Sequence, residues 1–117
     1  MSATTHVLKQ LQLLQRLIQK DEEQDEVVEV TVSKLVSYEL EKLKGRQRRI
    51  REKLAALEER HGLRTEEFQQ KFRKGILDDE TDFFEWSALA DMYQEVVQQL
   101  IEAEPANHAS PNSGATQ

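Results

Sequence analysis

The stretch SKLVSYELEKLKGRQRRIREKLAALEERH, residues 33–61, carries mostly apolar residues at alternating steps of four and three. A seam of this kind, sustained over more than three heptads, is typical of a helix that packs lengthwise against another helix. Gly45 falls on the side facing away from the seam, where it costs about 1 kcal/mol relative to alanine without ending the helix. The seam consists of Val36, Leu40, Leu43, Gln47, Ile50, Leu54, Leu57 and His61.

Two glycines, each followed by an apolar residue, predict where helices end downstream of this stretch. Gly62 precedes Leu63 and Gly75 precedes Ile76, the pattern of a left-handed glycine whose apolar neighbour folds back on the last turn. Between them, TEEFQQKFRK is expected to form a short helix capped by Thr65. The chain is therefore predicted to reverse direction through a short helical elbow.

A second amphipathic helix is expected over residues 82–103, capped by Asp79 or Asp82, the latter with Glu85 at the spacing of a capping box. Acidic residues before a helix also suit its positive N-terminal dipole. Its seam consists of Trp86, Leu89, Tyr93, Val96 and Leu100. Antiparallel packing of the two heptad helices would bring Trp86 near Leu57 and Leu100 near Leu43. Phe68 and Phe72 would then close over the elbow against Phe83 and Trp86.

The N-terminal part of the chain shows three further patterns. Residues 4–20 have the apolar periodicity of an amphipathic helix, and 21–26 are a solvated acidic linker. VVEVTV, residues 27–32, alternates as a short strand would, or as an extended lead-in to a helix that Ser33 would cap. The polar remainder after Ala103 predicts a disordered tail.

Together these patterns predict an all-α fold. It is an antiparallel, coiled-coil-like helical hairpin with a short helix at the elbow and an additional N-terminal helix. The expected divisions are 1–26 for the N-terminal helix and linker, 27–103 for the hairpin, and 104–117 for the tail.

Composition excludes several classes of function. The chain has 117 residues, a net charge of −6 and no cysteine, which excludes disulfides and thiolate chemistry and disfavours non-specific nucleic-acid binding. The apolar positions of 7–18 are too interrupted for a signal peptide or a membrane span. DDETD lacks the spacing of a calcium loop, and His6, His61 and His108 are dispersed. We therefore expect a cytoplasmic protein with no enzymatic activity, metal, cofactor, small-molecule substrate or membrane contact.

The segment KLKGRQRRIREK, residues 42–53, holds seven of the sixteen Lys and Arg residues. The final helix offers uncharged residues at its flanking heptad positions, so the hairpin is not expected to neutralise this segment. An acidic protein surface, the 21–26 linker or nucleic-acid phosphate could do so. The candidate basic rim is Lys44, Arg46, Arg48, Arg49, Arg51 and Lys53.

Six of the seven aromatic residues lie between Phe68 and Tyr93, and the final helix is apolar well beyond its seam. A helix with so wide an apolar stripe requires cover on two sides, and the long helix supplies one. The N-terminal helix, another subunit or a foreign protein would supply the other. The candidate partner-binding residues are Phe68, Phe72, Phe83, Phe84, Trp86, Met92, Val97 and Ile101.

About 60 of the 117 residues carry a motif in which a glycine and E-E-F are followed by F-x-x-G, by D-D and by D-F-F-E-W-x-A-L-x-x-M. The chain is similar in this motif to small, mainly cyanobacterial proteins identified as antitoxins of type II toxin–antitoxin pairs. The matching residues are Gly62–Leu63, Glu66–Phe68, Phe72, Gly75, Asp78–Asp79, Asp82–Trp86, Ala88–Leu89 and Met92. The resemblance implies a small protein that wraps and silences a partner toxin, although the N-terminal helix is additional to the family pattern.

Two alternatives stay open beside an antitoxin. One is a ribbon–helix–helix DNA-binding autoregulator over 27–60, with 27–32 as the ribbon and Gly45 as the turn; the unbroken heptad through Gly45 argues against it. The other is a structural coiled-coil adaptor that forms a homo-oligomer without a toxin.

Overall fold

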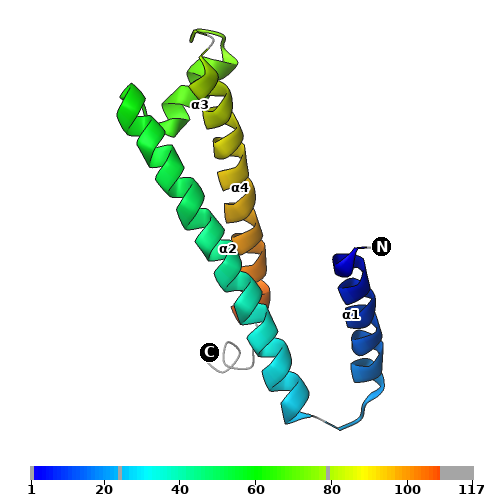
Figure 1. Cartoon of the computed structure of the whole chain (residues 1–117). Helices are drawn as coiled ribbons and strands as arrows, with labels where there is room; N and C mark the ends of the chain where they lie inside the picture. The colour runs from blue at the N-terminus through cyan, green and yellow to red at the C-terminus, as the bar shows by residue number, and fades with distance from the viewer. Residues whose placement is uncertain (1, 24, 79, 109–117) are drawn as a thin grey trace. The chain divides into compact units, whose positions relative to one another are not determined.

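The computed structural model describes residues 2–23, 25–78 and 80–108, the last five of them as backbone only. Over this part of the chain the protein is all-α, with no strand (Figure 1). Its helices are α1 (Ala3–Lys20), α2 (Glu26–His61), α3 (Thr65–Arg73) and α4 (Thr81–His108). The chain divides into two compact units: a first unit of residues 1–35 and a second unit that begins at Val36.

The predicted strand at 27–32 is wrong, because these residues belong to α2. A single strand would leave its backbone groups without partners, whereas a helix satisfies them within the segment. The helix begins earlier than expected because Asp25 caps it: Asp25 Oδ1 accepts a hydrogen bond from the N–H of Val27 at 2.9 Å. Ser33, the predicted cap, lies inside the helix. The acids Glu26 and Glu29 in the first turn add a favourable interaction with the helix dipole.

Both glycine stops are confirmed, with φ of 67° at Gly62 and 70° at Gly75. The N–H of Gly75 bonds the carbonyl of Phe72 and the N–H of Ile76 bonds that of Lys71, so α3 ends in a Schellman motif. Gly45, by contrast, lies within α2 at an ordinary helical φ. The turn that the ribbon–helix–helix alternative places there, like its strand, does not occur.

The helix caps near the elbow differ from the prediction. Arg64, rather than Thr65, is the N-cap of α3, and its backbone N–H donates to Glu67 Oε1 at 3.3 Å. α4 begins at Thr81, which places Asp82 inside the first turn rather than at the cap. Asp79 lies outside the described residues. The side chains of Thr65 and Asp82 each have another partner, identified below.

The C-terminal end of the last helix also differs. α4 continues to His108, so residues 104–108, predicted to begin a disordered tail, are helical. A proline at 105 lacks a backbone N–H, but its fixed φ is close to that of a helix. The rest of the predicted tail, 109–117, lies outside the described residues.

In the second unit, α2 and α4 run antiparallel, approach each other away from the elbow and diverge toward it, where α3 lies between them (Figure 1). The predicted proximities agree with this arrangement: Leu57 and Trp86 share one core cluster, and Leu43 and Leu100 pack against it. The cluster consists of Ile50, Leu54, Leu57, Phe68, Phe83, Trp86, Leu89 and Val96. The heptad seams thus form the core of the hairpin.

Candidate functional site

The aromatic residues of the elbow form the most completely buried part of the hairpin. Phe68 and Trp86 are both 0% exposed and stack in parallel, with ring centroids 4.1 Å apart and an interplanar angle of 3°. His61 stacks on the Trp86 ring at 5.5 Å, and Phe83 is tilted against Phe68 at 5.5 Å. Such pairs add about 0.5–1.5 kcal/mol each beyond the burial of their surface. The stretch around residues 83–86 therefore closes the elbow.

This placement corrects the partner-binding prediction for Phe68, Phe83 and Trp86, which have almost no surface to offer a partner. Sequence periodicity alone cannot separate a buried aromatic residue from an exposed one when a third helix fills the space between two others. Phe72 is half-buried against Phe68, and Phe84 is 60% exposed with its ring edge-on to Phe72.

A hydrogen-bonded chain of three residues joins the helices at the elbow. Trp86 Nε1 donates to Thr65 Oγ1 at 3.1 Å, and that hydroxyl donates to Glu58 Oε2 at 2.8 Å. The backbone N–H of Thr65 also donates to Glu58 Oε2, at 2.9 Å. Glu58, on α2, therefore satisfies an N-terminal N–H of α3 that the helix itself cannot satisfy. This explains why the Thr65 hydroxyl does not cap its own helix.

Burial alone would raise the pKa of the Glu58 carboxyl, but other interactions outweigh it. The two hydrogen bonds from Thr65, with the charges of Arg51 and Arg64, hold this pKa below its usual value. Glu58 is therefore ionised at neutral pH.

Asp82 connects the first turn of α4 to the last turn of α2. Its Oδ2 lies 2.6 Å from a guanidinium nitrogen of Arg60 and 3.1 Å from His61 Nε2. Hydrogen bonds from Arg60 and His61 hold the pKa of the Asp82 carboxyl below its usual value. Asp82 and His61 thus act in the structure of the elbow.

A groove follows the α2–α4 seam on one side of the hairpin, and we call it the seam groove. It comprises two adjoining pockets of about 320 Å³ each. Gln47 lines both pockets, which places the seam's one amide residue at their junction. α2 contributes Lys44, Gln47, Arg48, Arg51 and Glu52, and α4 contributes Tyr93, Val97, Leu100 and Ile101. One wall of the groove is therefore mostly cationic and the other largely apolar.

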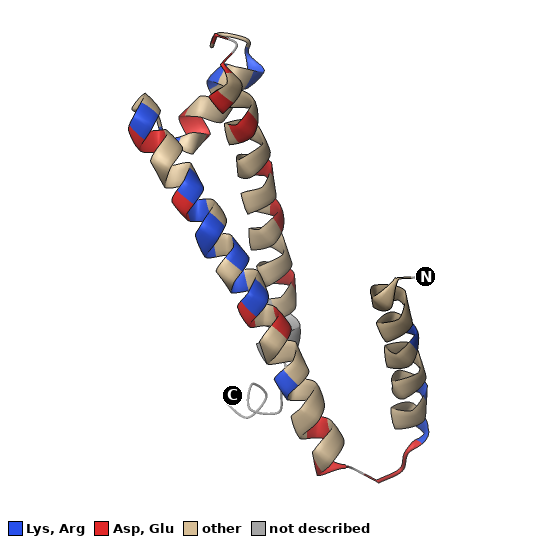
Figure 2. Cartoon of the chain, viewed as in Figure 1, with Lys and Arg blue, Asp and Glu red and all other residues tan. Residues whose placement is uncertain are grey.

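The basic rim is exposed throughout, and its spacing divides it into two rows. Steps of four and three place Lys44, Arg48 and Arg51 along the seam groove. Arg46, Arg49 and Lys53 follow the other flank of the seam. Figure 2 shows Lys and Arg gathered along α2, whereas the charged residues of α4 are all acidic.

Few acids neutralise this rim. Lys44 lies 3.6 Å from Glu41 and Arg51 lies 3.8 Å from Glu58, both partners being on α2 itself. Exposed pairs at these distances contribute little to stability. Within the described residues no acid of α4 pairs with either row. The prediction that the hairpin leaves these cations without an acidic counterpart on α4 is confirmed.

The remaining predicted partner-binding residues lie on α4. Val97 is half-buried and Ile101 is 55% exposed, and both line the seam groove. Met92 is 37% exposed but lies outside the groove's lining. Tyr93 and Gln47 line the groove without having been predicted to bind a partner. Both are polar residues at seam positions. Because a fully buried seam would be apolar, their polarity could have indicated that the seam is open to solvent there.

No group of three or more His, Cys, Asp or Glu side chains that could hold a metal ion occurs among the described residues. Over the same residues, no helix is long and apolar enough to cross a membrane. No protein-family model matches the chain, and no curated protein and no solved structure matches it. What the seam groove can bind therefore follows from its own chemistry.

Proposed function

We propose that this chain is a protein-interaction module that binds an acidic segment of a partner protein in the seam groove and thereby neutralises that partner. One observation carries the proposal. Lys44, Arg48 and Arg51 form a cationic row whose facing residues on α4 are apolar. In a helix pair without a partner, acids on α4 would be expected opposite this row, because repulsion among neighbouring cations destabilises the folded state.

The chemistry of the two walls specifies the occupant. Carboxylates of the partner would lie against the cationic row, and apolar side chains would enter beside Val97 and Ile101. An acidic amphipathic helix fits both requirements, because three- and four-residue spacing places its charges on one edge and its apolar residues on the other. Charge complementarity of this kind sets the association rate and the choice of partner more than the final affinity.

The resemblance to antitoxins supports a toxin as that partner and, with it, a cytoplasmic and bacterial setting. Part of the shared motif serves the elbow: Gly62, Phe68 and Trp86 set its turn and its stacked core. An antitoxin of this type would present a preformed hairpin, and preformed surfaces bind with less loss of conformational entropy than surfaces ordered on contact.

The test is expression of the tagged full chain at its native level in its native host. The expected result is a stoichiometric small protein that co-purifies, that arrests growth when expressed alone and whose effect is relieved by co-expression of this chain. Isolation of the chain alone would overturn the proposal. Co-purification of a protein without toxicity would support binding but remove the antitoxin assignment.

Matched variants locate the interface. Lys44→Glu with Arg48→Glu reverses two charges in the groove, while Arg46→Glu with Arg49→Glu makes the same net change on the opposite row. Only the first pair is expected to release the partner, with a loss of about 100-fold or more in affinity if both contacts are close charge pairs. Equal effects of the two pairs would remove the groove as the binding site.

The same variants separate a protein partner from nucleic acid, which the exposed arginines could also attract. Phosphate binding is largely non-directional and depends steeply on salt, so both rows would matter alike. The ribbon–helix–helix form of DNA binding lacks its strand and its turn in the described residues. Binding of the chain's own promoter DNA, weakened equally by both pairs of substitutions, would favour nucleic acid over a protein.

A further inference from the structure

The N-terminal part of α2 carries a stripe of exposed side chains that changes in character along its length. Steps of four and three place Asp25, Glu29, Val32 and Val36 on one face of the helix, and we call these residues the α2 stripe. Its first half is acidic and its second half is apolar. Val32 is 37% exposed and Val36 is 43% exposed, so the stripe is a surface rather than part of a core.

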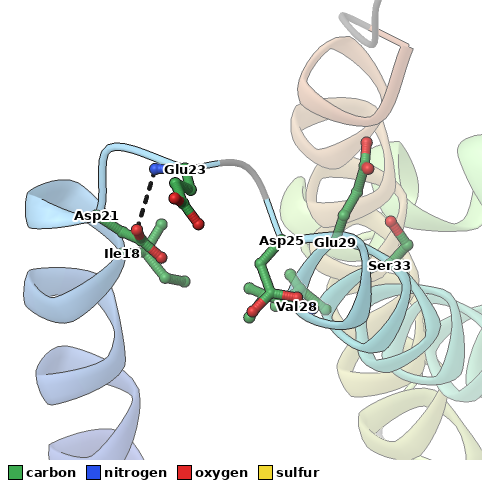
Figure 3. A pocket seen from close by; sticks show the side chains of 8 residues that line it. Ile18, Asp21, Glu23, Asp25, Val28, Glu29 and Ser33 are labelled. Carbon is green, nitrogen blue, oxygen red and sulfur yellow. Dashed lines mark hydrogen bonds between the residues drawn. The ribbon is translucent and has the colours of Figure 1, made fainter.

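The space beside the α2 stripe is open. A pocket of about 460 Å³ lies there, lined by Val28, Glu29 and Val32 from α2 and by Ile18 from α1. Figure 3 shows Ile18 and Val28 on opposite sides of this space. Ile18 itself is 42% exposed, so α1 does not cover the stripe. A helix from another molecule therefore has room to pack against it.

The seam groove has two matching parts, which follow each other in the opposite order along α2. In the direction of the chain, α2 passes first the pocket walled by Val97 and Ile101 of α4 and then the pocket that contains Arg48 and Arg51. One acid, Glu52, also lines the second pocket, four residues from Arg48 on the same helix. The groove thus runs from apolar to cationic, whereas the stripe runs from acidic to apolar. In an antiparallel arrangement the apolar parts meet each other, and acids meet cations.

We propose that, when no partner is bound, the seam groove holds the α2 stripe of a second copy of this chain, with the two α2 helices antiparallel. α2 is one helix from Glu26 to His61, so the stripe cannot fold back onto the groove of its own chain. The occupant therefore comes from another copy. Since the stripe and one wall of the groove both belong to α2, the contact is reciprocal and closes as a two-fold dimer.

Equal spacing on the two helices sets the register of this pairing. Glu26 and Glu29 are three residues apart, as are Arg48 and Arg51, so Glu29 faces Arg48 where Glu26 faces Arg51. The valines of the stripe then lie beside the apolar pocket, because they follow Glu29 along the chain as that pocket precedes Arg48. In this register each basic row meets acids and not the basic row of the other copy. The dimer also covers the side of α4 where Ile101 is 55% exposed.

The second copy and the partner proposed above would use the same groove. Self-association therefore competes with partner binding, and the partner must displace the second copy to enter. This competition rests on the proposed function, whereas the dimer rests on the groove alone. Because dimerisation is measured on the purified chain without a partner, the two proposals can fail separately.

The first test is the mass of the purified full chain by sedimentation equilibrium over a range of concentrations. The expected mass is twice the 13.6 kDa of one chain. Val32→Lys should weaken the dimer by about 100-fold or more, because each of the two contacts then places a cation in an apolar pocket that already contains Lys44. Val27→Lys adds the same charge on another face of α2, at a residue that is 73% exposed, and should leave the dimer intact. Neither valine belongs to the hairpin core, so helicity measured by circular dichroism should not fall.

The second test exchanges one pair of charges between the stripe and the groove. Glu29→Lys gives the stripe the sign of the groove, and Arg48→Glu gives the groove the sign of the stripe. Each variant alone should lose affinity for itself by about 10-fold or more. An equimolar mixture of the two should recover a heterodimer, because a cation faces an anion in both of its contacts. Docking within one chain could not recover on mixing.

Glu29→Lys also separates this inference from the proposed function, since it leaves the groove of each chain unchanged. The variant should lose the dimer and bind the partner at least as tightly as the wild type. A dimer that persists in this variant would overturn the inference and leave the proposed function untouched.

Three further results would overturn the proposal: a monomer at every concentration, a Val32→Lys variant that dimerises as Val27→Lys does, or charge-reversed chains that do not recover on mixing. Dimerisation of the wild type, its loss in Val32→Lys and its recovery in the mixture would together support it.

Discussion

α2 crosses from one unit into the other, and its two halves differ although they carry the same apolar stripe. From Leu43 to Leu57 the stripe packs against α3 and α4, and Leu54 is 1% exposed. From Val28 to Val36 it continues at steps of four, but Val32 and Val36 remain 37% and 43% exposed. Apolar periodicity therefore predicts which face of a helix is apolar. Whether that face is buried depends on whether another helix of the chain packs against it.

The difference between the two units is tested most strongly by replacing a leucine with alanine in each of them. Leu54→Ala should lower the free energy of unfolding by about 2–5 kcal/mol, because it removes a buried side chain and leaves a cavity. Leu13→Ala removes the same atoms from a residue that is 49% exposed, and it should change stability by less than about 0.5 kcal/mol.

The measurement is denaturant unfolding followed by the fluorescence of Trp86, the chain's one tryptophan. Because Trp86 lies in the hairpin core, a Leu13→Ala variant as unstable as Leu54→Ala would show that the first unit unfolds together with the hairpin. The division between the units would then be wrong.

The second prediction concerns the polar part of the elbow. Thr65→Val keeps the shape of the side chain but removes the hydroxyl, which leaves Trp86 Nε1 without its acceptor and Glu58 without one donor. A buried polar group without a partner costs about 1–3 kcal/mol. Thr65→Ser retains the hydroxyl and should cost less.

The readout is again the free energy of unfolding, compared between Thr65→Val and Thr65→Ser. Equal stabilities of the two variants would show that the hydrogen-bonded chain contributes nothing, and that stacking on Phe68 holds Trp86 alone.

Sequence alone predicted the helices, the glycine stops and the antiparallel pairing, because each depends on local chemistry or on periodicity. It failed where a side chain is satisfied by a residue distant in sequence. Thr65 and Asp82 both stand where a helix cap is expected, yet their side chains form hydrogen bonds with Glu58 and Arg60 of α2 instead. The strand at 27–32 failed for another reason, since alternating valines form a strand only where a neighbouring strand exists.

The candidate site was predicted in part. The basic rim follows from composition and heptad position, and Val97 and Ile101 follow from the wide apolar stripe of α4. The contact of Phe68 with Phe83 and Trp86 at the elbow was predicted and is confirmed. The assignment of the same three residues to a partner surface was wrong, because α3 lies between the two long helices and leaves these side chains almost no exposed surface.

The third prediction is a dependence of hairpin stability on pH. Glu58 and Asp82 both have a pKa that is lower in the folded state than the usual values of 4.5 and 3.8. Their contribution is therefore fully present above those values and is lost as the pH falls below them, because the unfolded chain then binds protons more readily. Stability should be nearly constant from neutral pH down to about 5 and then decline.

Glu58→Gln should be less stable than the wild type at neutral pH, and its acid decline should be shallower. Unfolding curves measured between pH 3 and pH 7 check both expectations. If the variant declines as steeply as the wild type, carboxylates elsewhere in the chain govern the acid response, and the elbow has no special part in it.

The smallest expected effects on stability come from replacing Gly62, which ends α2 at the elbow, and Gly45, which lies inside α2. At Gly62 φ is 67°, a region that costs a residue with a side chain about 1–2 kcal/mol, so Gly62→Ala should destabilise the hairpin although its added Cβ meets no atom within 4 Å. At Gly45 the backbone is helical and the nearest atom to an added Cβ is a guanidinium nitrogen of Arg49 at 3.4 Å, an ordinary contact with a flexible side chain. Gly45→Ala should therefore stabilise the protein by about 0.5–1 kcal/mol, because alanine loses less conformational freedom in a helix.

Thermal unfolding of the two variants should shift in opposite directions. A loss of stability at Gly45 would mean that α2 bends there, and the continuous helix that links the two units would have to be abandoned.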